Sequence, residues 1–240
     1  MKKLSLLTLA FAILSIVFFL LLIFLRTPFT PYPLMSIQDV LDILTPLVLI
    51  PLYWILFKYE ASDGSSLMEE IVFMVLTVFW VAGQGIHLSA NSINNLAEAL
   101  ARKHVIDITG TSIYQLTYFY DEHLGHFMWH IGVLGLAALL IYREWHWPAG
   151  VPTVWWATTL AGLIYGFTYF CIFLEGQTVV LGLPFAIIIT LLTLIRGRKK
   201  LTQQPILAFF FITCLVAVIL FGGWWLYWGG FPQFSDVGLI

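Results

Sequence analysis

Charge and cysteine are scarce in this sequence. Only 10% of its 240 residues are Asp, Glu, Lys or Arg, whereas a soluble domain carries about 25%, so the composition argues against a soluble globular enzyme. The formal net charge of −2 provides no basic surface for a nucleic acid. The two cysteines, Cys171 and Cys214, both lie inside apolar runs, which argues against a disulfide framework and a four-thiolate metal site.

Apolar residues make up 60% of the chain and gather in long runs. A helix needs about 20 mostly apolar residues to cross about 30 Å of hydrocarbon. The runs are continuous rather than alternating, which argues against a transmembrane barrel. We therefore predict an all-α polytopic membrane protein in which residues 1–240 form one bundle of seven transmembrane helices. The predicted spans are residues 4–25, 37–57, 71–90, 123–142, 155–174, 178–195 and 206–227.

The connection over residues 91–122 is long, and we expect it to form a helical extension on the outer side of the membrane. Residues 96–103 are rich in helix formers, so the third helix should continue past the bilayer. Ser112 and Gln115 have the spacing of a capping box, so the fourth helix should begin near Ile113.

Lysine and arginine are unevenly distributed between the two sides of this arrangement. With a cytoplasmic N-terminus, eight of them fall on the cytoplasmic side and three on the other. Because positive residues favour the cytoplasmic side, we predict a cytoplasmic N-terminus and an outside C-terminus, in the plasma membrane or an inner membrane. The eight are Lys2, Lys3, Lys58, Arg143, Arg196, Arg198, Lys199 and Lys200, and the three are Arg26, Arg102 and Lys103.

Ionisable residues within the spans gather near their outer ends, and such residues mark functional sites in membranes. Helix positions i, i+3, i+4 and i+7 share a face. His123, His126 and His130 should therefore form one stripe on the fourth helix, with Glu122 at its edge. Asp121 should point away from this stripe if the helix is regular there.

The third helix carries a second polar stripe, formed by His87, Asn91 and Asn94. If the third and fourth helices are antiparallel neighbours, the two stripes can meet. Imidazole nitrogen and carboxylate oxygen are ligands of zinc, and the i, i+4 spacing of His126 and His130 presents two ligands from one helix face. We therefore predict a site for zinc, or another divalent transition metal, with His87, His126 and His130 as its ligands.

Nearby polar side chains are candidates for catalysis, for substrate binding and for support of the metal ligands. Glu122 and Glu175 are the candidate catalytic carboxylates, acting as a general base or a further ligand. The candidates for binding a substrate or for supporting the ligands are Asn91, Asn94, His123, Asp39 and Asp42. The alternative interpretation is that these side chains only form hydrogen bonds between helices.

Seven spans, an N-in topology, the pair His126 and His130, and a third histidine on another helix resemble the CREST superfamily. That group includes alkaline ceramidases and the adiponectin/progestin-type receptors. The resemblance implies a seven-helix fold with an intramembrane zinc site, and hydrolysis of amides in several members. The family carries its histidine pair on the last span, whereas this chain carries the pair on the fourth.

Two classes of function remain open at this point. The first is metal-dependent hydrolysis of a lipid amide or ester in the outer leaflet, with membrane lipids as surroundings and as substrate. The second is a non-catalytic membrane protein that binds or transports a metal, a proton or a small ligand. A haem-binding redox protein ranks lower, because His126 and His130 are too close together to serve two stacked haems.

Overall fold

The computed structural model describes residues 3–25, 27–32, 34–59 and 64–239. Within them the chain is helical apart from loops and one isolated bridge, between Pro28 and Ser36. Lys2 and Arg26, both used in the orientation prediction, lie outside the described residues. The helical elements are α1 (Lys3–Phe19), η1 (Leu21–Phe24), α2 (Ile37–Asp42), α3 (Leu44–Tyr59), α4 (Leu67–Arg102), α5 (Ser112–Tyr118), η2 (Phe119–Gly125), α6 (His126–His146), α7 (Trp155–Glu175), α8 (Val179–Leu192), η3 (Thr193–Gly197) and α9 (Pro205–Trp228).

Six helical stretches among the described residues are long and apolar enough to cross a membrane, which makes this a polytopic membrane protein of the predicted all-α class. They are Ile37–Tyr59, Leu67–Arg102, Ser112–His146, Trp155–Glu175, Val179–Gly197 and Pro205–Trp228. The helix in the region of the first predicted span, residues 4–25, is shorter than predicted. The helix α1 is apolar but only 17 residues long, and a 3₁₀ turn at Leu21–Phe24 follows it.

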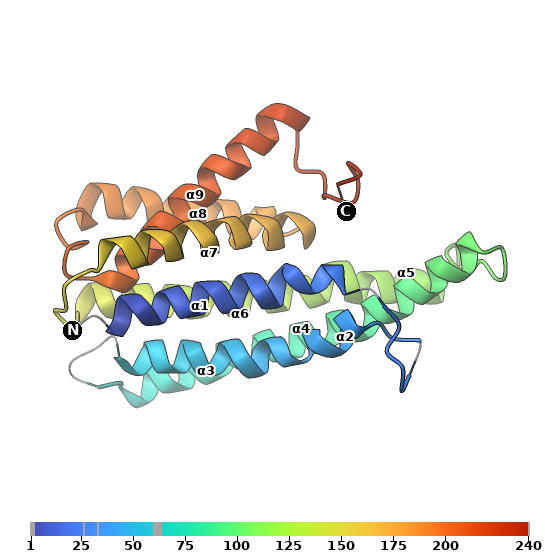
Figure 1. Cartoon of the computed structure of the whole chain (residues 1–240), viewed down its shortest axis with the longest axis horizontal. Coiled ribbons are helices and arrows are strands. Elements are labelled where there is room, and N and C mark those ends of the chain that lie inside the picture. The colour runs from blue at the N-terminus through green and yellow to red at the C-terminus, as the bar shows by residue number, and fades with distance from the viewer. Residues whose placement is uncertain (1–2, 26, 33, 60–63, 240) are drawn as a thin grey trace.

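The two helices predicted to extend beyond their membrane spans, the third and the fourth, do so. The helix α4 runs for 36 residues, about 54 Å, so it does continue past its predicted span. The helical stretch that contains the fourth span begins at Ser112, one residue before the expected start, because Thr111 rather than Ser112 is the cap and accepts the amide of Tyr114. This α4–α5 hairpin extends well beyond the other helices (Figure 1).

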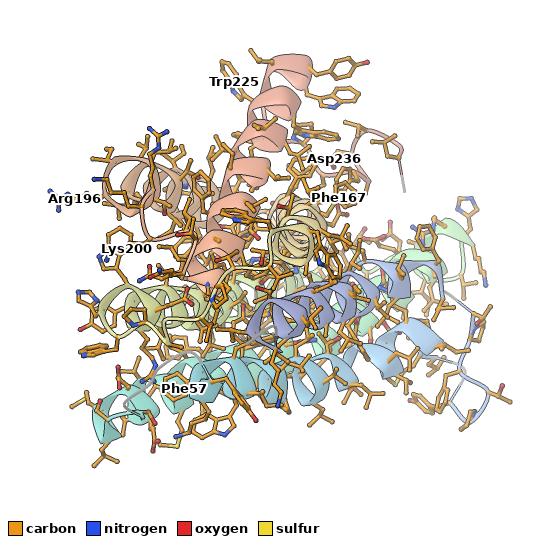
Figure 2. The ribbon with its side chains drawn as sticks, turned by 60° about the vertical axis from the view of Figure 1, so that its left-hand side comes forward. Phe57, Phe167, Arg196, Lys200, Trp225 and Asp236 are labelled. Carbon is orange, nitrogen blue, oxygen red and sulfur yellow. The ribbon has the colours of Figure 1, made fainter. Side chains whose placement is uncertain are left out.

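The helices α1, α3 and α7 share one aromatic core. Phe11 of α1 lies at its centre, with ring centroids 4.7 Å from Tyr53, 5.1 Å from Tyr165 and 6.2 Å from Phe209. The last helix, α9, starts within this core and then leaves the bundle obliquely (Figure 1). Figure 2 shows Trp225 near the far end of α9, where its side chain is 52% exposed.

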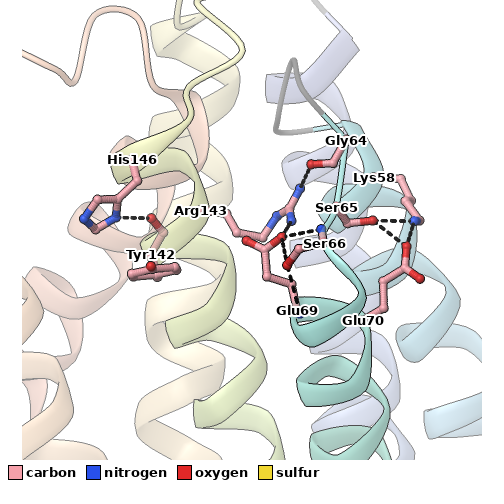
Figure 3. A network of polar contacts seen from close by, with 9 residues as sticks. All are labelled: Lys58, Gly64, Ser65, Ser66, Glu69, Glu70, Tyr142, Arg143 and His146. Atoms are coloured by element: carbon pink, nitrogen blue, oxygen red, sulfur yellow. Dashed lines mark hydrogen bonds and ion pairs between the residues drawn. The ribbon is translucent and has the colours of Figure 1, made fainter.

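Arg143 ties α6 to the start of α4 at one end of the bundle (Figure 3). The guanidinium is buried, and it donates to Glu69 Oε2 at 2.7 Å and to the Gly64 carbonyl at 3.2 Å. It also lies 4.2 Å above the ring of Phe57. Beside it, Glu70 pairs with Lys58. We call these groups the Arg143 network. In it Glu69 is the partner of a buried cation and part of the capping box of α4, whereas Glu70 is the partner of the partly exposed Lys58.

Candidate functional site

Glycine residues bring α4 and α6 into direct backbone contact. A Cβ atom on Gly83 would lie 2.3 Å from the amide nitrogen of Trp129, and one on Gly132 would lie 2.6 Å from that of Trp80. A Cβ on Gly125 would lie 2.9 Å from the amide nitrogen of His87. Small residues permit this close approach between membrane helices, and it places the polar stripe of α4 directly against that of α6.

Three imidazole rings meet at this interface. The ring centroids of His87 and His126 are 4.3 Å apart, and those of His126 and His130 are 5.8 Å apart, with the two rings nearly parallel at 12°. Trp129 lies beside all three, at 5.8, 6.1 and 5.0 Å in the same order. The structure thus brings together the three histidines that the sequence predicts as ligands. We call the three rings and their hydrogen-bond partners the histidine cluster.

The start of the fourth span is a π-helix, η2, and it changes which residues face the cluster. A π-helical turn contains an additional residue and is frequent at functional sites. Asp121 is turned inward and is 2% exposed; its Oδ1 lies 2.6 Å from His87 Nδ1, and its Oδ2 accepts Asn94 Nδ2 at 2.8 Å. The expectation that Asp121 points away required a regular helix, and that condition does not hold.

The same π-helix removes His123 from the predicted stripe. Its side chain is exposed and packs beside Phe119, with ring centroids 5.8 Å apart. A regular helix would place His123 near His126, but the added residue turns it away from the cluster. Among the candidates on this helix, His126 and His130 therefore face inward and His123 does not.

An oxygen atom lies beside Nδ1 of each of the three rings. For His87 the partner is Asp121, as described above. The Nδ1 atom of His126 lies 3.4 Å from the Glu122 carbonyl and 3.7 Å from Glu122 Oε2. The Nδ1 atom of His130 is hydrogen-bonded to the hydroxyl of Thr178. Thr178 belongs to the turn between α7 and α8, and sequence reasoning missed it because nothing local to it marks a ligand partner.

Three polar atoms of the site are buried without a hydrogen-bond partner among the described residues. They are His130 Nε2, the indole Nε1 of Trp129 and Asn94 Oδ1. Leaving a buried polar group unpaired costs roughly 1–3 kcal/mol, so native proteins rarely contain several of them close together. Seven further side-chain atoms elsewhere among the described residues are also buried without a partner, so the feature of this site is that three such atoms belong to residues of the cluster or next to it.

Glu122 and Glu175 connect the cluster to the C-terminal segment. Gln177 donates to Glu122 Oε2 at 3.1 Å and to Gln233 Oε1 at 3.2 Å. The carboxylate of Glu175 accepts the amide of Phe234 at 3.0 Å and the hydroxyl of Ser235 at 3.3 Å. We call residues 231–236 the C-terminal strap. Glu122 thus lies beside His126, whereas Glu175 holds the strap.

The remaining predicted site residues have other hydrogen-bond partners within the described part of the chain. Asp39 forms a capping box with Ser36 at the start of α2. The backbone carbonyl of Asp42 accepts Gln84 Nε2 at 2.9 Å, while its carboxylate lies within electrostatic reach of His87. Asn91 accepts a hydrogen bond from Asn95 at 3.0 Å. Asn94 is hydrogen-bonded to a cluster residue, Asp121.

The donor chemistry of the cluster suits a transition metal, although its present geometry is not that of a closed metal site. Among the residues that the structure describes, no group of three His, Cys, Asp or Glu side chains is placed to hold a metal ion. The parallel rings of His126 and His130 do not point at one common position. Metal-ligating histidines commonly engage their second ring nitrogen with an oxygen partner, and the contacts at Nδ1 described above follow this pattern.

A comparison with known proteins finds one similarity of note. The chain is 24% identical, over 201 residues, to the ceroid-lipofuscinosis neuronal protein 6 homolog of Canis lupus familiaris. The match covers 78% of this chain and 62% of that protein, so the chain spans less than two thirds of the relative's length. No protein-family profile matches the chain, and no solved structure matches it. The likeness to the CREST superfamily therefore remains an expectation from the histidine pattern.

Proposed function

We propose that the histidine cluster binds a divalent transition metal, zinc being the candidate, and that this site hydrolyses an amide or ester of a membrane lipid. One observation carries the proposal: an oxygen partner lies beside Nδ1 of all three rings, and Nε2 of His130 is buried with no partner in the described part of the chain. That is the arrangement in which histidine nitrogens are oriented for a metal. When bound, zinc supplies Lewis acidity and an activated water.

The protein side chains would divide the remaining work. His87, His126 and His130 are the ligands, and binding by all three requires one of the parallel rings to turn. Asp121 holds the orientation of His87. Glu122 lies beside His126 and is held by Gln177, so it is the side chain placed to take up a proton as general base. Glu175 is engaged with the C-terminal strap, which assigns it a positioning role.

A second candidate function follows from the His87–Asp121 contact. The imidazole and the carboxylate are 2.6 Å apart, and the side chain of His87 is 16% exposed. Such a pair exchanges protons with its surroundings without a metal. In this alternative the cluster binds or passes a proton or a small polar ligand, and the unpaired atoms of Trp129, His130 and Asn94 are its contacts.

Metal analysis separates these two candidates. The protein is purified without chelator, and bound zinc per chain is measured in the parent and in the variants His87→Gln, His126→Gln and His130→Gln. The matched control is His123→Gln, because His123 comes from the same helix but faces outward. We expect about one zinc per chain in the parent and the control, and loss of most of it in each of the three variants, because the ligands of one metal act as a unit.

A parent protein without metal would reject the zinc site and favour the second candidate, and an absorption spectrum of the same sample tests for haem. If the parent does hold zinc, Glu122→Gln distinguishes ligand from base. A general base replaced by Gln keeps the metal and loses turnover of a lipid amide or ester, whereas a lost ligand lowers the metal content.

We also propose the orientation given by the charge distribution, with the N-terminus in the cytoplasm and the histidine cluster near the outer surface of a plasma or inner membrane. Figure 2 shows Arg196 and Lys200 on the η3 side of the molecule. In intact cells, a cysteine at Gly110 should react with a membrane-impermeant thiol reagent and one at Lys199 should not. The reverse labelling would invert the orientation and place the cluster on the cytoplasmic side.

A further inference from the structure

A long apolar groove runs along the face of α4 that points away from the histidine cluster. It has a volume of about 500 Å³. Its floor follows α4 from Val81 to Leu96, about 22 Å of helix, and Met35, Ile43 and Pro46 form the opposite wall. The helices α2 and α3 meet at Ile43, on this opposite wall. None of the three cluster histidines lines it.

Most polar side chains in the groove already have hydrogen-bond partners. The hydroxyls of Ser89 and Ser92 each donate to the backbone carbonyl four residues earlier, at 3.0 Å. Gln84 accepts the indole N–H of Trp80 at 2.7 Å and donates to the carbonyl of Asp42. Asp39 accepts the amide of Ser36 at 2.7 Å. An extended peptide in the groove would find few partners for its own backbone groups, so the lining favours a hydrocarbon chain.

The position of the groove relative to the bilayer points to the same occupant. The predicted third span ends at residue 90, so the groove begins within the hydrocarbon and continues to Leu96 beyond its edge. Apolar surface exposed to water costs about 25 cal/mol per Å², and the upper part of the groove is covered if a chain rises into it from the bilayer. Tyr32, which is 55% exposed, lines the groove outside the predicted spans.

We propose that this groove binds one acyl chain of a membrane lipid, drawn partly out of the bilayer along α4. The lining residues, the satisfied polar groups and the continuity across the predicted membrane edge carry this proposal. The binding site goes beyond the proposed hydrolysis, because it exists whether or not the histidine cluster holds a metal.

Gly85 offers a way to fill the groove without disturbing the fold. It lines the groove, and a Cβ atom added there would meet nothing within 4 Å. The side chain of a leucine at this position would therefore occupy the space proposed for the acyl chain. Leucine also favours the helix more than glycine does. Ser89→Leu is a second variant that narrows the same groove from one turn further along. Val78→Leu is the matched control, because Val78 lies on α4, is 64% exposed and does not line the groove.

The test uses the full chain in phosphatidylcholine vesicles that contain a small fraction of phosphatidylcholine with a photoactivatable group in one acyl chain. After irradiation, the crosslinked positions are mapped by mass spectrometry. We expect the label to concentrate at residues 88–96 in the parent and in Val78→Leu, and most of it to be lost in Gly85→Leu and Ser89→Leu. The melting temperature of each variant shows that the protein remains folded.

Equal labelling at residues 88–96 in the parent and in both groove variants would overturn the proposal, as would label spread evenly over every lipid-facing helix. Label confined to residues before 88 would also overturn it, and would leave the upper part of the groove to a different occupant. The same measurement on His126→Gln should match the parent, so failure of the metal site and failure of the groove are distinguished.

Discussion

The Arg143 network and the histidine cluster lie toward opposite ends of the paired helices α4 and α6, and both bury polar side chains. In the first, the buried guanidinium has a carboxylate, a carbonyl and an aromatic face as partners. In the second, an imidazole nitrogen, an indole N–H and an amide oxygen are buried without partners among the described residues. The first is arranged as a structural tie between helices; the second retains open bonding capacity, as expected of a site that receives a ligand.

Breaking the Arg143 network should have the largest effect on stability. Arg143→Ala removes the partner of Glu69, and losing one member of a buried ion pair costs about 3–5 kcal/mol. The measurement is the free energy of unfolding in detergent. Arg102→Ala is the control, because Arg102 is 70% exposed and pairs with Glu98 at the surface, where such pairs are worth about 1 kcal/mol or less. Equal losses of unfolding free energy in the two variants would show that Arg143 does not have this structural role.

The contact between α4 and α6 joins the two regions, and a single methyl group should disturb it. In Gly132→Ala the new Cβ would lie 2.6 Å from the amide nitrogen of Trp80, so the helices must separate, at about 1–3 kcal/mol of unfolding free energy. Gly85→Ala on the opposite face of α4 meets nothing within 4 Å and should be neutral or slightly stabilising. A neutral Gly132→Ala would mean that the helices do not pack as closely as described.

Asp121 tests whether the histidine cluster differs from the Arg143 network in binding a metal. If the proposed metal site exists, Asp121→Asn weakens the orientation of His87 and should lower zinc affinity about 10- to 100-fold, as measured by competition with a chelating dye. Asp107→Asn, in the exposed loop between α4 and α5, should leave zinc affinity unchanged. An unchanged affinity in Asp121→Asn would assign that carboxylate a purely structural role like that of Glu69.

The smallest effect is expected at the C-terminal strap. Glu175→Gln replaces a charged acceptor of the Phe234 amide by a neutral one, which should cost about 1 kcal/mol locally. The exchange rate of that amide with deuterated water should rise roughly fivefold, while the melting temperature changes little. Glu98→Gln, far from the strap, should not alter the exchange. A strap amide that exchanges at the same rate in both variants would show that Glu175 does not hold the strap.

The helical class and the meeting of the polar stripes could be predicted from the sequence, because both depend on local periodicity. His87, His126 and His130 were identified by their spacing and by depths counted from the helix ends. Asp121 was not assigned to the cluster, because nothing in its local sequence signals the π-helix that turns it inward. Thr178 and Gln177 were missed for another reason: their partners are 48 and 55 residues away in the chain, and only tertiary packing brings them together.

The π-helix has a consequence for how this site can change during evolution. Each residue of a regular helix turns the chain by about 100°, so one added residue acts as a rotational offset between α5 and α6. A deletion of one residue between Phe119 and Glu122 would cancel that offset and leave α6 in place. The helix α5 would then rotate relative to α6, and the set of side chains presented to His87 would be exchanged by a change of length alone, with no substitution in either helix.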